Sequence, residues 1–254
     1  MNKAWMFLLT GMSVFTLSAG AAGVFPVDRM ETGSGILEIT LVGHGTLMMK
    51  YQGKVIHIDP WTRLGDYTAM PKADLILVTH GHMDHFDPSA MEMIKKEGTV
   101  ILLPKVCAKG LGGEQVLANG ESKTVAGLLI EAVPAYNIVH MRAKDTPFHP
   151  KGEGNGYIIT FGDKRVYVAG DTENTPEMKA LKNIDAAFLP MNLPYTMSPE
   201  MVADAVRAFR PRIVYPYHYG PESMTGMGEM IKTELQGLIQ DVKGVDVRVP
   251  AAAE

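Results

Sequence analysis

The chain has 254 residues, of which 46% are hydrophobic and 20% are charged, and its 24 basic and 28 acidic residues give a net charge of -4. This composition is typical of a globular protein with a sizeable core, most simply one folded domain. The acidic balance excludes a general attraction to phosphate backbones, so no nucleic acid partner is expected. The single cysteine, Cys107, excludes an intramolecular disulfide and leaves mainly nitrogen and oxygen as metal ligands.

The N-terminus has the pattern of a secretory signal peptide. Lys3 supplies a positive charge, residues 4–17 are largely apolar, and residues 18–23 are small, as a cleavage site requires. The apolar run is shorter than the ~20 residues of a membrane-spanning helix, which favours cleavage over a retained anchor. We therefore expect a signal peptide over residues 1–22, a secreted or periplasmic protein, and no stable membrane span after cleavage.

Strands and helices are expected along the rest of the chain. The composition indicates a linker over residues 23–35, which contain Pro26, and one folded domain over residues 36–254. The β-forming runs are residues 36–48 (interrupted at 43–45), 55–58, 75–78, 99–103, 128–133, 156–161, 165–168, 186–189, 213–217 and 245–249. The helical patterns are residues 89–97, 198–209 and 222–239. Early hairpins followed by alternating strands and helices predict an α/β fold of two sheets with helices outside.

A cluster of potential metal ligands follows one short apolar strand. His80, His82, Asp84 and His85 place three imidazoles and one carboxylate within six positions. Alternate residues of one loop can turn to two different cations, and we expect the small Gly81 to let that loop fold tightly. These ligands suit Zn²⁺, and also Mn²⁺ or Fe²⁺. The alternative is a solvated polar loop that happens to be rich in histidine.

This cluster resembles the H-x-H-x-D-H signature of the metallo-β-lactamase superfamily. Other segments resemble further motifs of that family, in the same order along the chain: Asp59, Gly170-Asp171-Thr172 and Pro216-Tyr217-His218-Tyr219. The resemblance covers about residues 36 to 220 and implies a four-layer αββα sandwich of two mixed β-sheets flanked by helices. Within the superfamily, the chain looks most like the branch that contains ascorbate-phosphate lactonases and N-acyl phosphatidylethanolamine phospholipase D.

The resemblance also implies roles for individual residues. The implied ligands of a first divalent cation are His80, His82 and Asp171. The implied ligands of a second cation are Asp84, His85, His218 and, as a bridge, Asp171. Asp59 would support a ligand histidine from outside the metal shell, and Asp84 would also be the catalytic group that orients water or carries its proton. Together these roles predict a hydrolase in which hydroxide, activated by two metal ions, attacks an ester, lactone or phosphodiester.

The chain departs from the family pattern at one position. Members usually place another histidine, a ligand of the first metal, where this chain has Tyr136 and Asn137. Either the first metal has a more open site with Tyr136 or Asn137 nearby, or His149 reaches in from the following loop. His44, which lies between two glycines, is a candidate contact of the metals or the substrate, and a turn histidine bonded to backbone is the alternative.

Two other functions stay open at this point. One is a metal-binding protein that has kept the fold with degenerate or no catalysis, and the other is a di-iron redox protein. The substrate is expected to be a small molecule, and three basic loop residues would favour an anionic one: Arg142, Lys144 and Lys151. A homo-oligomer is compatible with the sequence.

Overall fold

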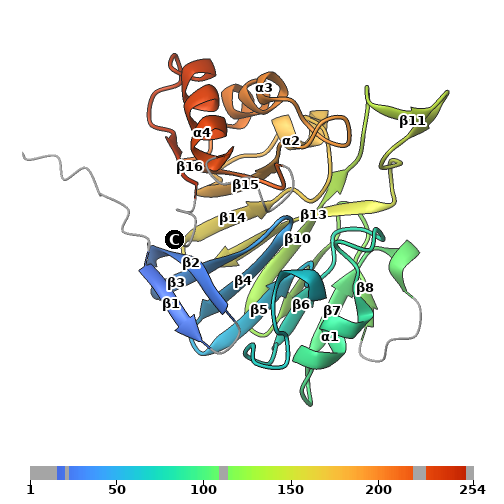
Figure 1. The fold of residues 1–254 in the computed structure, drawn as a ribbon, viewed down its shortest axis with the longest axis vertical. Helices are drawn as coiled ribbons and strands as arrows, with labels where there is room; N and C mark the ends of the chain where they lie inside the picture. Colours follow the sequence, from blue (N-terminus) through green and yellow to red (C-terminus); the bar gives the residue numbers. More distant parts are fainter. Residues whose placement is uncertain (1–15, 21–22, 109–113, 220–226, 250–254) are drawn as a thin grey trace, which may run out of the picture.

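Two β-sheets lie face to face, and helices cover their outer faces (Figure 1). This computed structural model describes residues 16–20, 23–108, 114–219 and 227–249. Most of the expected signal peptide therefore lies outside the described residues. In the part of the chain that is described, no helix is long and apolar enough to cross a membrane.

The first sheet contains eight strands in sequence order. Its antiparallel strands are β1 (Thr16–Gly20), β2 (Gly23–Thr32), β3 (Gly35–Gly43), β4 (Thr46–Tyr51) and β5 (Lys54–Ile58). The strands that continue it in parallel are β6 (Leu75–Leu77), β7 (Val100–Leu103) and β8 (Glu114–Val116). All three residues of β6 are buried, as expected for a parallel strand covered on both faces.

The second sheet contains seven strands in the order β17-β16-β15-β14-β13-β10-β9. Its parallel strands are β14 (Lys164–Val168), β15 (Ala186–Pro190), β16 (Ile213–Tyr217) and β17 (Asp246–Val247). Its antiparallel strands are β9 (Ser122–Val125), β10 (Leu128–Ala135) and β13 (Gly154–Phe161). Between β10 and β13, the short strands β11 (Met141–Ala143) and β12 (Thr146–Pro147) form a hairpin that projects from the body of the molecule (Figure 1).

Three layers of apolar packing hold the sheets and helices together. The largest cluster lies between the sheets and joins residues such as Ile39 and Phe188. A second cluster packs the outer face of the second sheet against α2 (Pro176–Lys179), α3 (Pro199–Phe209) and α4 (Met227–Leu238). A third packs the first sheet against α1 (Pro88–Ile94), with the short 3₁₀ helices η1 (Thr62–Leu64) and η2 (Lys105–Cys107) in the same half of the chain. The predicted four-layer α/β sandwich is confirmed.

The linker predicted over residues 23–35 is wrong, because β2 occupies most of it and pairs with both β1 and β3. Val27 and Met30 are buried against the sheet, which gives this segment the apolar contacts that a linker lacks. Asp28, also buried, accepts hydrogen bonds from the Tyr215 hydroxyl and, at 2.8 Å, from Arg248 Nη1. β2 thus belongs to the folded core.

Candidate metal centre

The predicted site residues meet at one edge of the sandwich, although they come from distant parts of the sequence. Each lies in a loop next to a strand end: His44 follows β3, Asp59 follows β5, His80 to His85 follow β6, His149 precedes β13, Asp171 follows β14, and His218 follows β16. The ends of neighbouring parallel strands open at the same edge of a sheet, which is where sites form in open α/β folds. The fold therefore explains how these side chains converge.

Four of them form what we name the first ligand group: His80, His82, His149 and Asp171. One potential ligand atom from each lies within 4.8 Å of the others. His80 Nε2 is 3.0 Å from His82 Nδ1, and Asp171 Oδ2 is 3.4 Å from His149 Nε2. His149 thus takes the place beside this group that was uncertain in the sequence.

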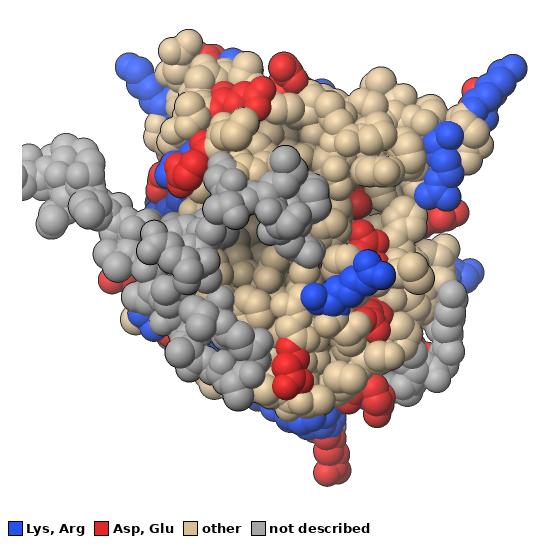
Figure 2. Space-filling view, viewed as in Figure 1, with Lys and Arg blue, Asp and Glu red and all other residues tan. Residues whose placement is uncertain are grey.

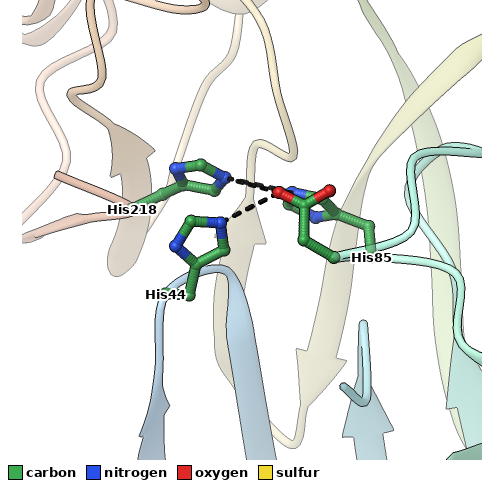
Figure 3. Close-up of side chains that lie close together, drawn as sticks. His44, His85 and His218 are labelled. Carbon is green, nitrogen blue, oxygen red and sulfur yellow. Dashed lines mark hydrogen bonds and ion pairs between the residues drawn. The ribbon is translucent and has the colours of Figure 1, made fainter. Parts of the chain in front are cut away.

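The second ligand group consists of His44, Asp84, His85 and His218. The three imidazoles converge on the Asp84 carboxylate (Figure 3). His44 Nε2 is 2.9 Å from Asp84 Oδ2, and the Nε2 atoms of His85 and His218 are 3.1 Å apart. His44 therefore contacts the site and is more than a turn residue bonded to backbone.

Asp171 lies between the two groups, and its two carboxylate oxygens face different ones. Oδ2 is on the side of the first ligand group, 3.9 Å from His80 Nε2. Oδ1 is 3.5 Å from His85 Nε2 and 3.6 Å from His218 Nε2 in the second group. This is the arrangement that a carboxylate bridging two cations requires.

The residues present fit two divalent cations. Ligands bound at 2.0–2.2 Å in a tetrahedral shell lie about 3.4 Å apart, and the spacings above are close to that value. Asp171 Oδ1 and His149 Nε2 are buried and have no hydrogen-bond partner among the described residues. Buried polar atoms are costly unless they are partnered, and a cation would partner both. A donor set of imidazole nitrogens and carboxylate oxygens suits zinc, manganese or iron.

Asp59 and Thr79 orient one histidine in each group through its Nδ1 atom. Asp59 accepts hydrogen bonds from Thr79 N at 2.7 Å, from Thr79 Oγ1 at 2.6 Å and from His85 Nδ1 at 2.7 Å. Because the Thr79 hydroxyl proton is used on Asp59, its oxygen accepts from His80 Nδ1 at 3.0 Å. Both imidazoles therefore carry their proton on Nδ1 and present Nε2 to the centre.

Asn137 does the same for His149, and Asn192 contacts His218. The Asn137 side-chain oxygen accepts from His149 N at 2.9 Å and from His149 Nδ1 at 2.7 Å, so His149 Nε2 points at Asp171. The Asn192 amide nitrogen lies 3.1 Å from His218 Nδ1. Tyr136 lies outside both groups, because its hydroxyl donates to Glu177 and accepts from Lys151.

Burial and neighbouring charges divide the histidines into two kinds. Burial and the charge of His85 hold the pKa of His80 well below 6.5, so this imidazole stays neutral and keeps a lone pair for a cation. Burial also lowers the pKa of His85, but Asp171 and Asp59 outweigh that effect and raise it to about 9. The metal-free site therefore holds a proton on His85 that a cation must displace.

This geometry also depends on three residues that the sequence analysis did not predict as part of the site. Thr79 and Asn192 belong to no motif, and only their positions just after buried strands could have drawn attention to them. Gly45 is required because a Cβ there would lie 2.6 Å from His85 Cε1. The expectation for Gly81 is wrong, since a Cβ at that position would meet only Cys107 Sγ at 3.5 Å, an ordinary contact.

A cavity of about 210 Å³ opens beside the first ligand group. One wall consists of His80, His82 and His149. The apolar residues of the other walls are Phe86, Val106, Cys107, Phe148 and Pro150. A small molecule in this cavity would lie directly against the ligand histidines.

Comparison with known proteins agrees with this geometry. The model of the beta-lactamase superfamily domain matches residues 38–218. A UPF0173 metal-dependent hydrolase of Methanopyrus kandleri is 32% identical over 82% of this chain and 96% of its own length. A crystal structure described as a metal-dependent hydrolase, from Parabacteroides distasonis, is 46% identical, has a TM-score of 0.80, and is matched over 89% of this chain and 98% of that chain.

A third comparison extends the likeness to an archaeal enzyme. The metallo hydrolase Igni18 of Ignicoccus hospitalis is 27% identical, with a TM-score of 0.65 over 86% of this chain and 96% of that chain. These names agree with the predicted metal-dependent hydrolase, whereas the finer resemblance to lactonases and phospholipase D stays a prediction. The chain belongs to the β-lactamase superfamily and, within it, to the UPF0173 family of metal-dependent hydrolases.

Proposed function

We propose that this chain hydrolyses an ester, lactone or phosphodiester of a small molecule, with two divalent cations bound in the two ligand groups. The observation that carries the proposal is the position of Asp171, whose two oxygens face different groups at 3.4–3.9 Å. A carboxylate shared in this way holds two cations close together. Zinc is the first expectation for both, with manganese or iron as alternatives.

Such a pair of cations supplies a water of lowered pKa and polarises the bond that is attacked. The chain's own contribution is to fix the geometry in a site that is largely closed to solvent. Asp84 is the acid of the second ligand group, with about a third of its side chain exposed, and it accepts a hydrogen bond from His44. It is therefore placed to orient the attacking water and to take its proton.

The alternative of a degenerate site loses its main support. It depended on the lack of a further histidine near Tyr136, and His149 now lies in the first ligand group. Iron content with a visible chromophore is the finding that would favour the di-iron alternative. Export as a secreted or periplasmic protein is also part of the proposal, and N-terminal sequencing of exported protein tests it.

Elemental analysis combined with a substrate panel tests the proposed function. We expect two equivalents of metal per chain and turnover of at least one member of a panel of lactones, carboxylic esters and phosphodiesters. Asp171→Ala should lose metal and activity together and keep the circular dichroism spectrum of the wild type. The matched control is His140→Ala, because His140 lies in neither ligand group and its Nδ1 lies 2.7 Å from Glu173 Oε1.

Two results would contradict this function. One is full activity with normal metal content in Asp171→Ala. The other is a well-folded wild type that binds no more than one equivalent of metal from zinc, manganese or iron solutions.

A further inference from the structure

The cavity beside His82 has room for one ring or a short chain. Its volume of about 210 Å³ exceeds the roughly 150 Å³ of an apolar cavity that accepts benzene. Phe148 forms one wall and is itself packed edge-on against Tyr195, with ring centroids 5.0 Å apart. The one carboxylate among the lining residues is Glu153, which is exposed. An uncharged apolar group suits this interior, because Glu153 would repel an anion there.

A single arginine lies at the edge of this cavity. Arg142, on β11, places Nη2 3.4 Å from His82 Nε2 and its guanidinium carbon 5.9 Å from the centre of the Phe148 ring. No carboxylate among the described residues forms an ion pair with it. Figure 2 shows positive side chains at the corner where the β11–β12 hairpin projects. The Arg142 guanidinium is thus positioned beside the site by the Phe148 ring and not by an ion pair with a carboxylate.

The orientation of His82 leaves this guanidinium without a satisfactory acceptor. His82 directs Nδ1 at His80 Nε2, 3.0 Å away, and therefore into the first ligand group. When Nδ1 binds a cation, the neutral ring carries its proton on Nε2. Arg142 and His82 then face each other with donors only. The N–H groups of Arg142 are free for an acceptor from outside the chain, and carboxylate or phosphate fits them best.

We propose that the substrate carries an apolar ring or short chain that enters the cavity beside His82, and an anionic group that binds Arg142. This inference rests on the proposed function and adds the substrate class to it. The reaction remains addition of water across an ester bond, which yields an acid and an alcohol. Arg142 takes no part in the proton transfers and acts by binding and positioning the substrate.

A matched pair of esters tests the anionic half. Phenyl pentanoate ends in a methyl group, and the monophenyl ester of glutaric acid has a carboxylate at the same position. We expect the zinc-loaded wild type to prefer the glutarate ester by at least about tenfold in kcat/KM, the value of one charged hydrogen bond. Arg142→Gln should lose this preference through a higher KM for the glutarate ester. Lys144→Gln, on the same hairpin and without contact to His82 or Phe148, should keep it.

Calorimetry supplies a readout that does not need turnover. The zinc-loaded wild type should bind 4-phenylbutyrate at least about tenfold more tightly than butyrate, because the ring fills the cavity, and Arg142→Gln should weaken the binding of 4-phenylbutyrate by a similar factor. Hydrolysis of both esters without preference overturns the inference and leaves the proposed function intact. Binding that depends on Arg142, with no ester, lactone or phosphodiester hydrolysed, supports the ligand site at Arg142 and the cavity while the proposed function fails. Binding that is equal in wild type and Arg142→Gln overturns the inference.

Discussion

At the scale of single residues, the centre depends on how closely the backbone approaches His85. Gly45 lies in the turn between β3 and β4, and a Cβ there would lie 2.6 Å from His85 Cε1 and 3.4 Å from His218 Cδ2. His85 cannot retreat, because it is fully buried and bonded to Asp59 at 2.7 Å. The missing side chain is therefore part of the metal site.

Gly45→Ala should lose metal from the second ligand group and at least about a hundredfold in activity, because His85 must leave its place. Elemental analysis and rates with a responsive ester from the substrate panel measure both effects. Gly81→Ala is the control, since its new Cβ has only an ordinary contact with Cys107 Sγ. Equal metal content and rates in the two variants would show that the steric argument is mistaken.

Sequence motifs predicted most of the residues that the structure brings together, because those residues carry the distinctive chemistry of imidazole and carboxylate. The residues that orient the candidate ligands were harder to predict. Thr79 acts through a hydroxyl shared between Asp59 and His80, a contact between loops that follow different strands. Asn192 approaches His218 from a third loop. Such contacts depend on how the loops pack, which local patterns do not encode.

At the scale of elements, β5 is tied to the long loop that leads from it to β6. His57 in the middle of β5 is fully buried, and its Nε2 donates to the Pro71 carbonyl at 3.0 Å. Burial dominates its protonation and lowers its pKa from 6.5 to about 4, although the bond to Pro71 opposes this. This loop is also fixed where Trp61 N donates to the Tyr67 hydroxyl at 2.9 Å.

The protein should therefore lose stability as the pH falls from 6.5 to 4. In this window the unfolded chain binds a proton at residue 57 and the folded chain does not, so folding is opposed by up to about 3 kcal/mol at pH 4, and stability is regained as the pH rises. Urea unfolding at pH 4.5 and 7.5 measures the effect. His57→Gln keeps a donor for Pro71 and should show a smaller loss between these pH values. An identical loss in both proteins would place the effect elsewhere.

Element prediction succeeded where apolar periodicity was strong, as in β6, β15 and α3. It was wrong for β2, because Pro26 and the glycines that follow it dominate the local composition, whereas the strand is held by long-range contacts of Val27, Asp28 and Met30. The helix expected to end at residue 97 ends at Ile94, since Lys95 is already extended. The start of the last predicted helix falls on residues 220–226, outside the described residues.

At the scale of the whole molecule, the ligand groups join the two halves of the sandwich. Loops of the first sheet supply His44 and the segment 80–85, and loops beside strands of the second sheet supply His149, Asp171 and His218. Each group contains side chains from both halves. A cation bound there links the sheets directly, and the unfolded chain offers no such site.

Removal of metal should therefore lower the melting temperature. At a thousandfold excess of free metal over its dissociation constant, binding adds about 4 kcal/mol, or roughly 10 °C for a chain of this size. Thermal unfolding before and after chelation measures this, and added zinc should restore the original value. Asp171→Ala should respond much less to the chelator. A melting temperature that is unchanged by verified metal removal would contradict this link between the sheets.

Asp28 joins the beginning of the folded chain to its end. It lies on the second strand, and its partners are Tyr215 and Arg248, close to the last described residue. Removal of residues 1–22 leaves these contacts of Asp28 intact and makes β2 the outermost strand of its sheet. Trimming ten residues further would remove Asp28, so the buried Tyr215 hydroxyl would lose its acceptor and the half-buried Arg248 would keep Asp246 alone. Shortened versions of the protein therefore have a lower limit near Val27.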